Sequence, residues 1–316
     1  MATTDVTAAA PGPVVPRPRA SKRGPGARLR RRNTLIGWTF ILPNFLGFAT
    51  LTLVPVLILF YLAFTSWNAF GAATLTGTEN FQRLLTDATF HTALRNTAYY
   101  AVMHIPLTLG LSLGLAMLLN RKMRGMAFFR TVAFFPYITS IVAIAVVWNM
   151  LFSSDAGLIN QVLMALGIDD PPGWTASATW SMPAVVIVST WRDMGYYMLL
   201  FLAGLQAVPA ELYEAARVDG ANALQRFRNV TIPSLRPTTF FVTVMLTIAS
   251  FKVFDLILVM TDGGPGTSTL VLSQYIYRKG FEENDFGYAS AVAVVLFVIC
   301  LTVTVLQFLA NKRRDR

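Results

Sequence analysis

The sequence has little charge and almost no cysteine. Only 13% of its 316 residues are charged, whereas a soluble protein carries about 25%. Cys300 is the one cysteine, which excludes a disulfide within the chain and a zinc site built on cysteines. Hydrophobic residues make up 54% of the chain and the mean hydropathy is +0.53. Such a chain cannot cover its apolar residues with a water-facing shell, so we expect an integral membrane protein.

The apolar residues are concentrated in six long stretches. A bilayer core of roughly 30 Å requires about 20 apolar residues in a helix, and each stretch is long enough. Lipid offers the backbone no hydrogen-bond partners, and the runs are continuous rather than alternating, which predicts helices and not a barrel. Pro43 and Pro55 predict a tilt or kink in the first span. The six predicted spans are 37–66, 97–119, 133–152, 183–206, 238–260 and 289–310.

Positive charge lies mainly on one side of these spans. One side comprises the segment before the first span, the second and fourth connections and the segment after the sixth span, and it carries twenty Lys and Arg residues. The other connections carry four. Because Lys and Arg stay in the cytoplasm, both termini are predicted to be cytoplasmic. The formal charge of +10 therefore indicates topology, and no nucleic-acid partner is expected.

The first residues differ in composition from the rest of the chain. Residues 1–32 mix Pro, Ala, Thr and Arg without periodicity. They are predicted to form a disordered basic cytoplasmic tail before a transmembrane domain at 33–316. In the outer connections, 81–94 is amphipathic and 156–167 is predicted to lie on the outer surface. Each of these two stretches is either a loop packed on the bundle or a docking surface for an external partner.

The connection between the fourth and fifth spans starts with a predicted short helix. Pro209 suits the first turn of a helix, and Glu211 and Glu214 suit its N-terminal end. Glu214 and Arg217 are three residues apart, a spacing that allows an ion pair on a helix. Gly220 then interrupts the pattern.

A second short helix is predicted at 222–230, and Pro233 and Pro237 limit its continuation into the fifth span. Two short helices that meet at a glycine would project from the cytoplasmic face. A DNA-binding helix-turn-helix has a similar outline, but it needs a three-helix core for which this connection is too short.

The same connection resembles the EAA loop of binding-protein-dependent ABC importer permeases. Glu214-Ala215-Ala216, Gly220 and Val230-Thr231-Ile232-Pro233 carry the resemblance, and Val230 and Ile232 are conservative departures from the family pattern. Further stretches are similar to the maltose-type, carbohydrate-importing branch of that family, at 77–87, 124–137, 203–221 and 254–269.

The resemblance implies an all-α permease subunit with six transmembrane helices in a bacterial plasma membrane. It would take up a sugar or oligosaccharide delivered by an external solute-binding protein, and a second permease would complete a heterodimer. Two copies of a cytoplasmic ATPase would bind ATP and Mg. This chain lacks a GxxxxGK[ST] phosphate loop, so it is expected to bind no cofactor and to be no enzyme. The residues implied to couple it to the ATPase are Glu211, Glu214, Ala215, Ala216, Arg217, Asp219, Gly220, Ala221, Phe227 and Pro233.

Four charged residues lie inside two of the spans, where each costs about 2.5–3.5 kcal/mol. Arg192-Asp193 in the fourth span and Lys252 and Asp255 in the fifth lie at comparable depths, and the latter two can pair at i, i+3. One interpretation is a charge-neutral clamp, with Arg192 or Asp193 reaching across to the fifth span. The other, which the resemblance favours, is a sugar site. The predicted sugar-site residues are Trp191, Arg192, Asp193, Tyr196, Tyr197, Phe251, Lys252, Phe254 and Asp255.

Two other function classes fit parts of the sequence. An ion-gradient-driven secondary carrier could use Asp193, Asp255 and His104 as a proton relay, but its expected internal repeats are not evident and the EAA loop would have no role. An intramembrane enzyme is disfavoured because no HExxH or GxSxG pattern with partner residues is present. His104 is expected to be packed or hydrogen-bonded, and no metal site is predicted. Disaccharide, oligosaccharide and glycerol phosphate importers share these motifs, so the substrate stays open.

Overall fold

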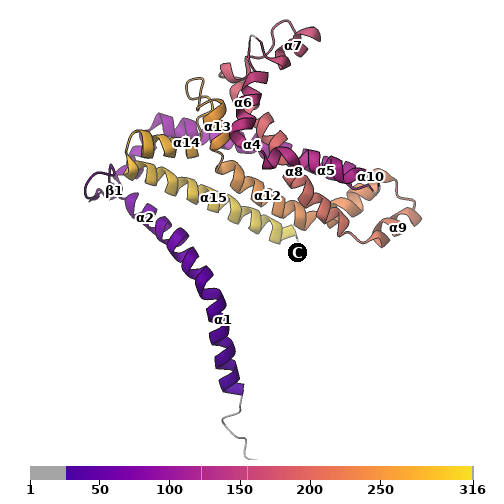
Figure 1. Cartoon of the computed structure of the whole chain (residues 1–316), viewed down its shortest axis with the longest axis horizontal. Coiled ribbons are helices and arrows are strands. Elements are labelled where there is room, and N and C mark those ends of the chain that lie inside the picture. Colours follow the sequence, from indigo (N-terminus) through magenta and orange to yellow (C-terminus); the bar gives the residue numbers. More distant parts are fainter. Residues whose placement is uncertain (1–25, 122, 155, 315–316) are drawn as a thin grey trace, which may run out of the picture. The chain divides into compact units, whose positions relative to one another are not determined.

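The chain is mostly helical in the computed structural model, which describes residues 26–121, 123–154 and 156–314 (Figure 1). Among the described residues, four helices are long and apolar enough to cross a membrane. Two bent helix pairs also qualify if each pair is counted as one span, which gives four to six candidate spans. The mostly helical fold with several candidate spans is thereby confirmed, whereas the number six and the orientation stay predictions. The four candidate spans that are not bent pairs are Ile36–Leu62, Ala88–Leu119, Ser181–Gln206 and Phe286–Lys312.

The first apolar segment is helical, with one irregular turn. It consists of α1 (Gly26–Phe48), a π-helical turn η1 (Ala49–Leu53) and α2 (Val54–Leu62). The wide turn directly precedes Pro55 in α2. A proline has no N–H to donate to the preceding turn, which disturbs the hydrogen-bond pattern at the place where the sequence predicts a kink.

The helix α1 begins earlier than the sequence predicts. The composition assigns residues 26–32 to a disordered tail, and this prediction is wrong because the structure places them in α1. Their Leu and Arg residues are good helix formers, and they continue directly into an apolar helix. The rest of the predicted tail, residues 1–25, lies outside the described residues.

A small hairpin and two helices follow. The strands β1 (Thr65–Ser66) and β2 (Thr74–Leu75) pair antiparallel. They are followed by α3 (Glu79–Thr86) and by the long α4 (Ala88–Leu119). The amphipathic stretch predicted at 81–94 is therefore helical but belongs to two helices.

The third predicted span, 133–152, is not one continuous helix. The structure divides it into α5 (Met126–Ile138) and α6 (Ile141–Leu151), which are bent by 96°. Pro136 removes a hydrogen-bond donor from the end of α5, and Thr139 is extended, with φ −75° and ψ 149°. The missing donor and the extended residue together account for the break.

The connection between α6 and the next long helix is stabilised by a side-chain hydrogen bond within it. It contains α7 (Leu158–Ala165), within the stretch 156–167 that the sequence predicts to lie on the outer surface, and a 3₁₀ turn η2 (Trp174–Ala176). The Trp174 indole Nε1 donates a hydrogen bond of 2.6 Å to the buried Asn160 Oδ1. The chain then enters α8 (Ser181–Gln206), which matches the fourth predicted span.

The fifth predicted span, 238–260, is divided as well. It forms α12 (Arg236–Phe251) and α13 (Asp255–Met260), with three non-helical residues at 252–254 between them. The sixth span is continuous. The elements after α13 are α14 (Leu272–Tyr277), a π-helical turn η4 (Arg278–Glu282) and α15 (Phe286–Arg314).

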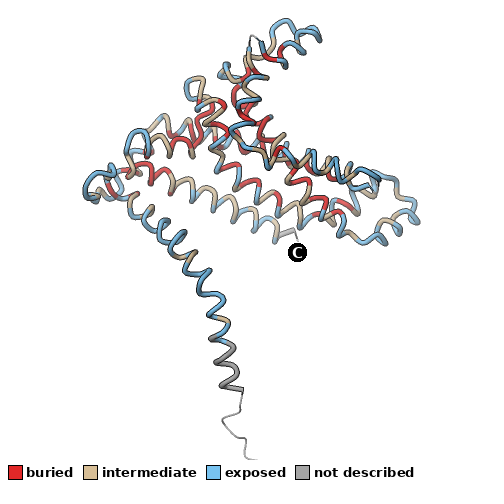
Figure 2. The backbone as a smooth tube through the Cα atoms, in the orientation of Figure 1, coloured by how far each residue is buried: buried red, intermediate tan, exposed pale blue. Residues whose placement is uncertain are grey.

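The core lies where four helices meet. α8 packs against α4, α5 and α12, and α12 also packs against α4 and α15. Figure 2 shows buried residues along α8 and α12, whereas α15 is buried near its start and has many exposed residues from 297 onward. Apolar side chains such as Leu301, Val305 and Leu309 are exposed on α15, which suits a helix that faces lipid.

Asp87 joins three elements at the start of α4. Its Oδ1 accepts hydrogen bonds from the backbone N–H groups of Thr89 (2.8 Å) and Phe90 (3.2 Å) and so caps the helix. Its Oδ2 accepts hydrogen bonds from the hydroxyls of Tyr275 on α14 and Tyr288 on α15. Burial by itself would raise the pKa of this carboxyl, but the hydrogen bonds outweigh burial and hold its pKa below the ordinary value of 3.8.

Replacing Asp87 with Ala should lower the melting temperature of the purified protein in detergent, because a lost helix cap alone costs about 0.5–2 kcal/mol. The pKa is lowered in the folded state, so the ionised carboxyl stabilises the fold above its unfolded pKa. The advantage of the wild type should therefore shrink as the pH falls through the lowered folded pKa. Asp169→Ala, at an exposed site, is the control. Equal melting of wild type and Asp87→Ala at neutral pH would contradict this role.

Candidate functional site

The break between α12 and α13 lies inside an apolar stretch. α12 ends at Phe251, and Phe254 has φ −144° and ψ −64° before α13 begins. Irregular backbone at membrane depth is tolerated only where protein surrounds it or where it lines a cavity. Both conditions hold, because the carbonyl of Val253 accepts a hydrogen bond from Ser273 Oγ and Val253 also lines a pocket.

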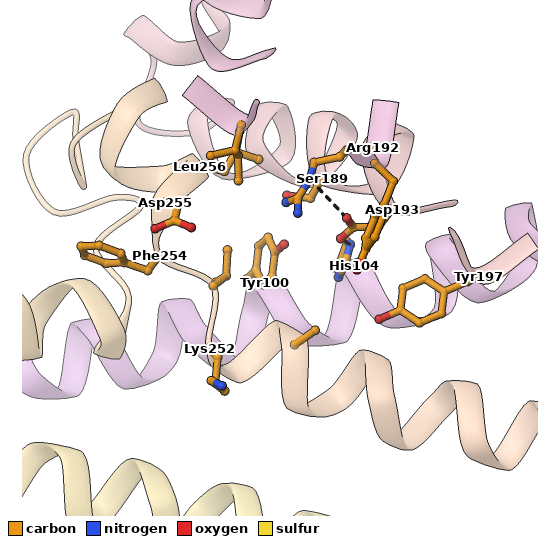
Figure 3. Close-up of a pocket in the computed structure, with 14 residues that line it drawn as sticks. Tyr100, His104, Ser189, Arg192, Asp193, Tyr197, Lys252, Phe254, Asp255 and Leu256 are labelled. Carbon is orange, nitrogen blue, oxygen red and sulfur yellow. Dashed lines mark ion pairs between the residues drawn. The ribbon is translucent and has the colours of Figure 1, made fainter. Parts of the chain in front are cut away.

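The pocket has a volume of about 200 Å³ and receives side chains from α4, α5, α6, α8, α12 and α13. Figure 3 shows Arg192 and Asp193 on one wall and Asp255 and Phe254 on the other, with Lys252 directed away from Asp255. The lining residues are Tyr100, His104, Tyr137, Ile141, Ser189, Arg192, Asp193, Tyr197, Ala249, Lys252, Val253, Phe254, Asp255 and Leu256.

Asp193 lies between two cationic or titratable side chains. Its Oδ2 is 3.4 Å from His104 Nε2, and its Oδ1 is 3.7 Å from Arg192 Nε. Neither contact is a well-aligned hydrogen bond, since both nitrogen atoms are buried without a hydrogen-bond partner. The other ring nitrogen, His104 Nδ1, lies 3.0 Å from Ser250 Oγ on α12. His104 is thus hydrogen-bonded, as the sequence predicts, and it also lines the pocket.

The predicted pairing of Lys252 with Asp255 is wrong. The helix is broken between these residues, so they no longer follow one another on a helical face, and they form no ion pair. The described residues also contain no ion pair between α8 and either half of the fifth span. A clamp made of Arg192 or Asp193 and a charge on the fifth span is therefore not what holds these helices together.

Six of the nine predicted sugar-site residues line the pocket and three do not. Trp191 packs edge-on against Trp148, with ring centroids 5.4 Å apart, and belongs to the apolar core. Tyr196 stacks on Tyr137 at 4.5 Å and supports the wall from behind. Phe251 is buried at the end of α12 and does not line the pocket.

Sequence reasoning missed three polar residues of the wall, namely Tyr100, Tyr137 and Ser189. A signal was present for Tyr100, because it lies four residues before His104 and therefore on the same helical face. The two rings stack at 5.1 Å. Tyr137 and Ser189 gave no such signal, since their place depends on how α5 and α8 pack.

The connection between α8 and α12 folds into two short helices around Gly220. α9 (Ala210–Val218) ends in a Schellman motif, in which the N–H of Gly220 donates to the carbonyl of Arg217 (3.0 Å) and the N–H of Ala221 to that of Ala216 (2.9 Å). Gly220 has φ +77°, a conformation that favours glycine.

The second half begins at Asn222, whose side chain and that of Gln225 form a capping box on α10 (Ala223–Arg226). A π-helical turn η3 (Phe227–Thr231) and α11 (Ile232–Ser234) then lead into α12, with a bend of 66°. Tyr213 Oη lies 3.1 Å from Thr231 Oγ1 and ties the two halves together.

Several details of this loop differ from expectation. Pro209 is the residue before α9 and not within its first turn, and Glu214 and Arg217 form no ion pair. Both side chains are exposed and free to meet a partner. Sequence reasoning also missed two apolar side chains at the tip, since Val218 is 87% exposed and Leu224 is 73% exposed.

The fold and the two sites describe a multi-span membrane permease with a polar pocket and a rigid helical loop. Residues 106–316 match the family "Binding-protein-dependent transport system inner membrane component". The chain belongs to this family. A chain of a bacterial ABC transporter involved in the import of the acidic polysaccharide alginate has a similar structure. The TM-score is 0.79 at 23% identity, covering 92% of this chain and 100% of the other, which supports the fold.

Several named relatives are similar over most of their length. The chain is 36% identical to the lactose transport system permease protein LacF of Rhizobium radiobacter, covering 90% of this chain and 97% of LacF. It is 35% identical to the diacetylchitobiose uptake system permease protein NgcF of Streptomyces coelicolor, covering 94% of this chain and 88% of NgcF. It is 37% identical to the probable ABC transporter permease protein YesP of Bacillus subtilis, covering 89% of this chain and 92% of YesP.

The wall of the pocket depends on a close approach of α8 to α5. A Cβ on Gly195 would lie 1.9 Å from the carbonyl oxygen of Ala133. Gly195→Ala should therefore force the helices apart and lower the melting temperature, because overpacking costs typically about 1–3 kcal/mol. Gly110→Ala in α4 is the matched control, since a Cβ at that position would have no atom within 4 Å. Similar melting of the two variants would refute the close-packed wall.

Proposed function

We propose that this chain is the permease subunit of an ATP-driven importer for a sugar or oligosaccharide. The observation that carries the proposal is the direct connection between the two sites. The loop around Gly220 continues through η3 and α11 into α12, and α12 ends at Phe251, directly before Lys252 in the pocket. A force applied to the loop would therefore reach the pocket along one helix of about 24 Å, at about 1.5 Å per residue.

The pocket suits a neutral, hydroxyl-rich ligand. Arg192 and Lys252 are balanced by Asp193 and Asp255, so the charged groups of the wall cancel. Tyrosine and phenylalanine rings offer flat apolar faces to a sugar ring, while carboxylates accept hydrogen bonds from its hydroxyls. The names of the relatives LacF and NgcF, which refer to lactose and diacetylchitobiose, support a saccharide.

The partners follow from the family. An external solute-binding protein would deliver the sugar, and the alginate transporter has been crystallised in complex with an alginate pentasaccharide-bound periplasmic protein. A second permease would complete a heterodimer, and two copies of an ATPase would bind ATP and Mg. The six-span topology with both termini in the cytoplasm of a bacterial plasma membrane would put the Gly220 loop on the ATPase side.

The exposed tip of this loop would enter a cleft of the ATPase. Val218 and Leu224 would bury their apolar side chains there, and the exposed Glu214 and Arg217 would pair with charges of the partner. The high exposure of Val218 and Leu224 leaves both side chains available for burial in such a contact.

Asp255→Asn should weaken sugar affinity, because it removes a charged acceptor from the pocket, and a roughly tenfold rise in KM is expected for a lost charge-assisted hydrogen bond. Uptake of lactose, diacetylchitobiose and arabino-oligosaccharides by cells that express the full transporter would identify a usable sugar. Glu282→Gln, an exposed acid elsewhere, is the control. A reduced amount of assembled complex, with an unchanged KM for the complex that remains, would point to a structural role instead.

Glu214→Lys should abolish uptake while leaving the chain in the membrane, because it reverses a charge on the surface proposed to contact the ATPase. Gly220→Val should weaken coupling too. No atom lies within 4 Å of a Cβ at this position, so its effect would come from the positive φ and not from a collision. Copurification of the ATPase measures the contact, and Asp169→Lys is the matched control. Normal uptake by Glu214→Lys at normal protein levels would refute the coupling surface.

ATP coupling itself can be separated from coupling to an ion gradient. Uptake should cease when ATP is depleted and persist when the proton gradient is collapsed with ATP maintained. The reverse result would favour a secondary carrier that uses Asp193, Asp255 and His104.

A further inference from the structure

A buried group of three side chains connects the pocket to the end of α12. Asp193 on α8, His104 on α4 and Ser250 on α12 lie in one row, with distances of 3.4 Å from Asp193 Oδ2 to His104 Nε2 and 3.0 Å from His104 Nδ1 to Ser250 Oγ. The side chain of His104 is 1% exposed and Ser250 is 1% exposed, whereas Asp193 lines the pocket. Figure 3 shows His104 directly beside Asp193.

This row is one of few polar links between α12 and its neighbours. Among the described residues, the side chains of α12 form two hydrogen bonds with other long helices: Ser250 with His104, and Thr247 with Gln307 on α15 (2.8 Å). Ser250 lies two residues before the break at Lys252. It therefore holds the end of the helix that runs from the Gly220 loop to the pocket.

We propose that His104 is a positioning residue that links the occupancy of the pocket to the position of α12. The proposal rests on the function proposed above. An Nε2–H that faces the Asp193 carboxylate leaves Nδ1 as the acceptor for the Ser250 hydroxyl. This arrangement fastens α12 to α4 and α8.

A sugar would release the fastening. Its hydroxyls donate hydrogen bonds to the Asp193 carboxylate and draw it away from His104, whose contact with Asp193 is already loose at 3.4 Å and poorly aligned. The buried Nε2–H then loses even this weak electrostatic contact, and a buried donor without any polar neighbour costs free energy. The ring turns to recover a partner, the bond to Ser250 breaks, and α12 is free to move with the Gly220 loop.

The test uses the full transporter complex in lipid nanodiscs, without sugar and without binding protein, and measures its basal rate of ATP hydrolysis. Ser250→Ala should raise this rate roughly three- to tenfold, the size expected from one lost buried hydrogen bond. His104→Gln should do the same, and the double variant should exceed neither single variant. Ser250→Thr keeps the hydroxyl and should restore the wild-type rate.

Thr108→Val is the matched control. Thr108 is a buried residue one turn after His104 on α4, and its hydroxyl contacts Thr190 on α8 at 3.3 Å but does not reach α12. Its basal rate should equal that of the wild type. A purely structural role would lower stability and ATP hydrolysis together, whereas the proposal predicts a gain in basal ATP hydrolysis. If Ser250→Ala fails to fold, His104→Gln alone decides the outcome.

The proposal is overturned if Ser250→Ala and His104→Gln hydrolyse ATP at the wild-type basal rate or more slowly. With an ATPase present and active in the wild-type complex, that result refutes the role of His104 and leaves the proposed function intact. If no ATPase copurifies with the wild-type chain, the proposed function fails and the role of His104 fails with it.

Discussion

The backbone groups of residues 252–254 require hydrogen-bond partners that lipid does not offer. The fold meets this requirement by surrounding the break with protein: Ser273 donates to the carbonyl of Val253, and α4, α5 and α8 provide the opposite wall. The break also allows Lys252 and Asp255 to point in different directions, which one continuous helix would not permit. A polar pocket in an apolar chain thus follows from the interruption of a single helix.

The same interruption separates α12, which connects two sites, from α13, which packs locally. α12 is joined to the Gly220 loop at its start and ends in the pocket, whereas α13 packs on α6 beyond the break. The Schellman motif at Gly220 and the capping box at Asn222 give the loop a fixed shape, which it needs if it is to transmit movement. Function in this account depends on one helix with a defined contact at each end.

The sequence predicts the mostly helical class, the positions of most long helices and the two-helix loop, because these depend on long apolar runs and on local turn residues such as Gly220. It does not predict the bend after Ile138 or the break at Lys252, since both lie in runs whose composition also suits a continuous span. Six of the nine predicted residues line the pocket, and four of these six are charges whose presence within an apolar stretch is costly enough to indicate a site. Trp191, Tyr196 and Phe251 lie outside the pocket lining, because aromatic composition does not tell which helical face meets the core.

Thiol labelling tests the central proposal, that the pocket at the break belongs to an ATP-driven permease; such a pocket is expected to open to opposite sides of the membrane when the ATPase is open and when it is closed. Lys252→Cys in a Cys300→Ala background would react with a membrane-impermeant maleimide applied to one side of proteoliposomes that contain the full complex. The account predicts labelling from the cytoplasmic side without ATP and from the outer side when vanadate traps the ATPase closed. Labelling from the same side in both states, or from neither, would contradict it.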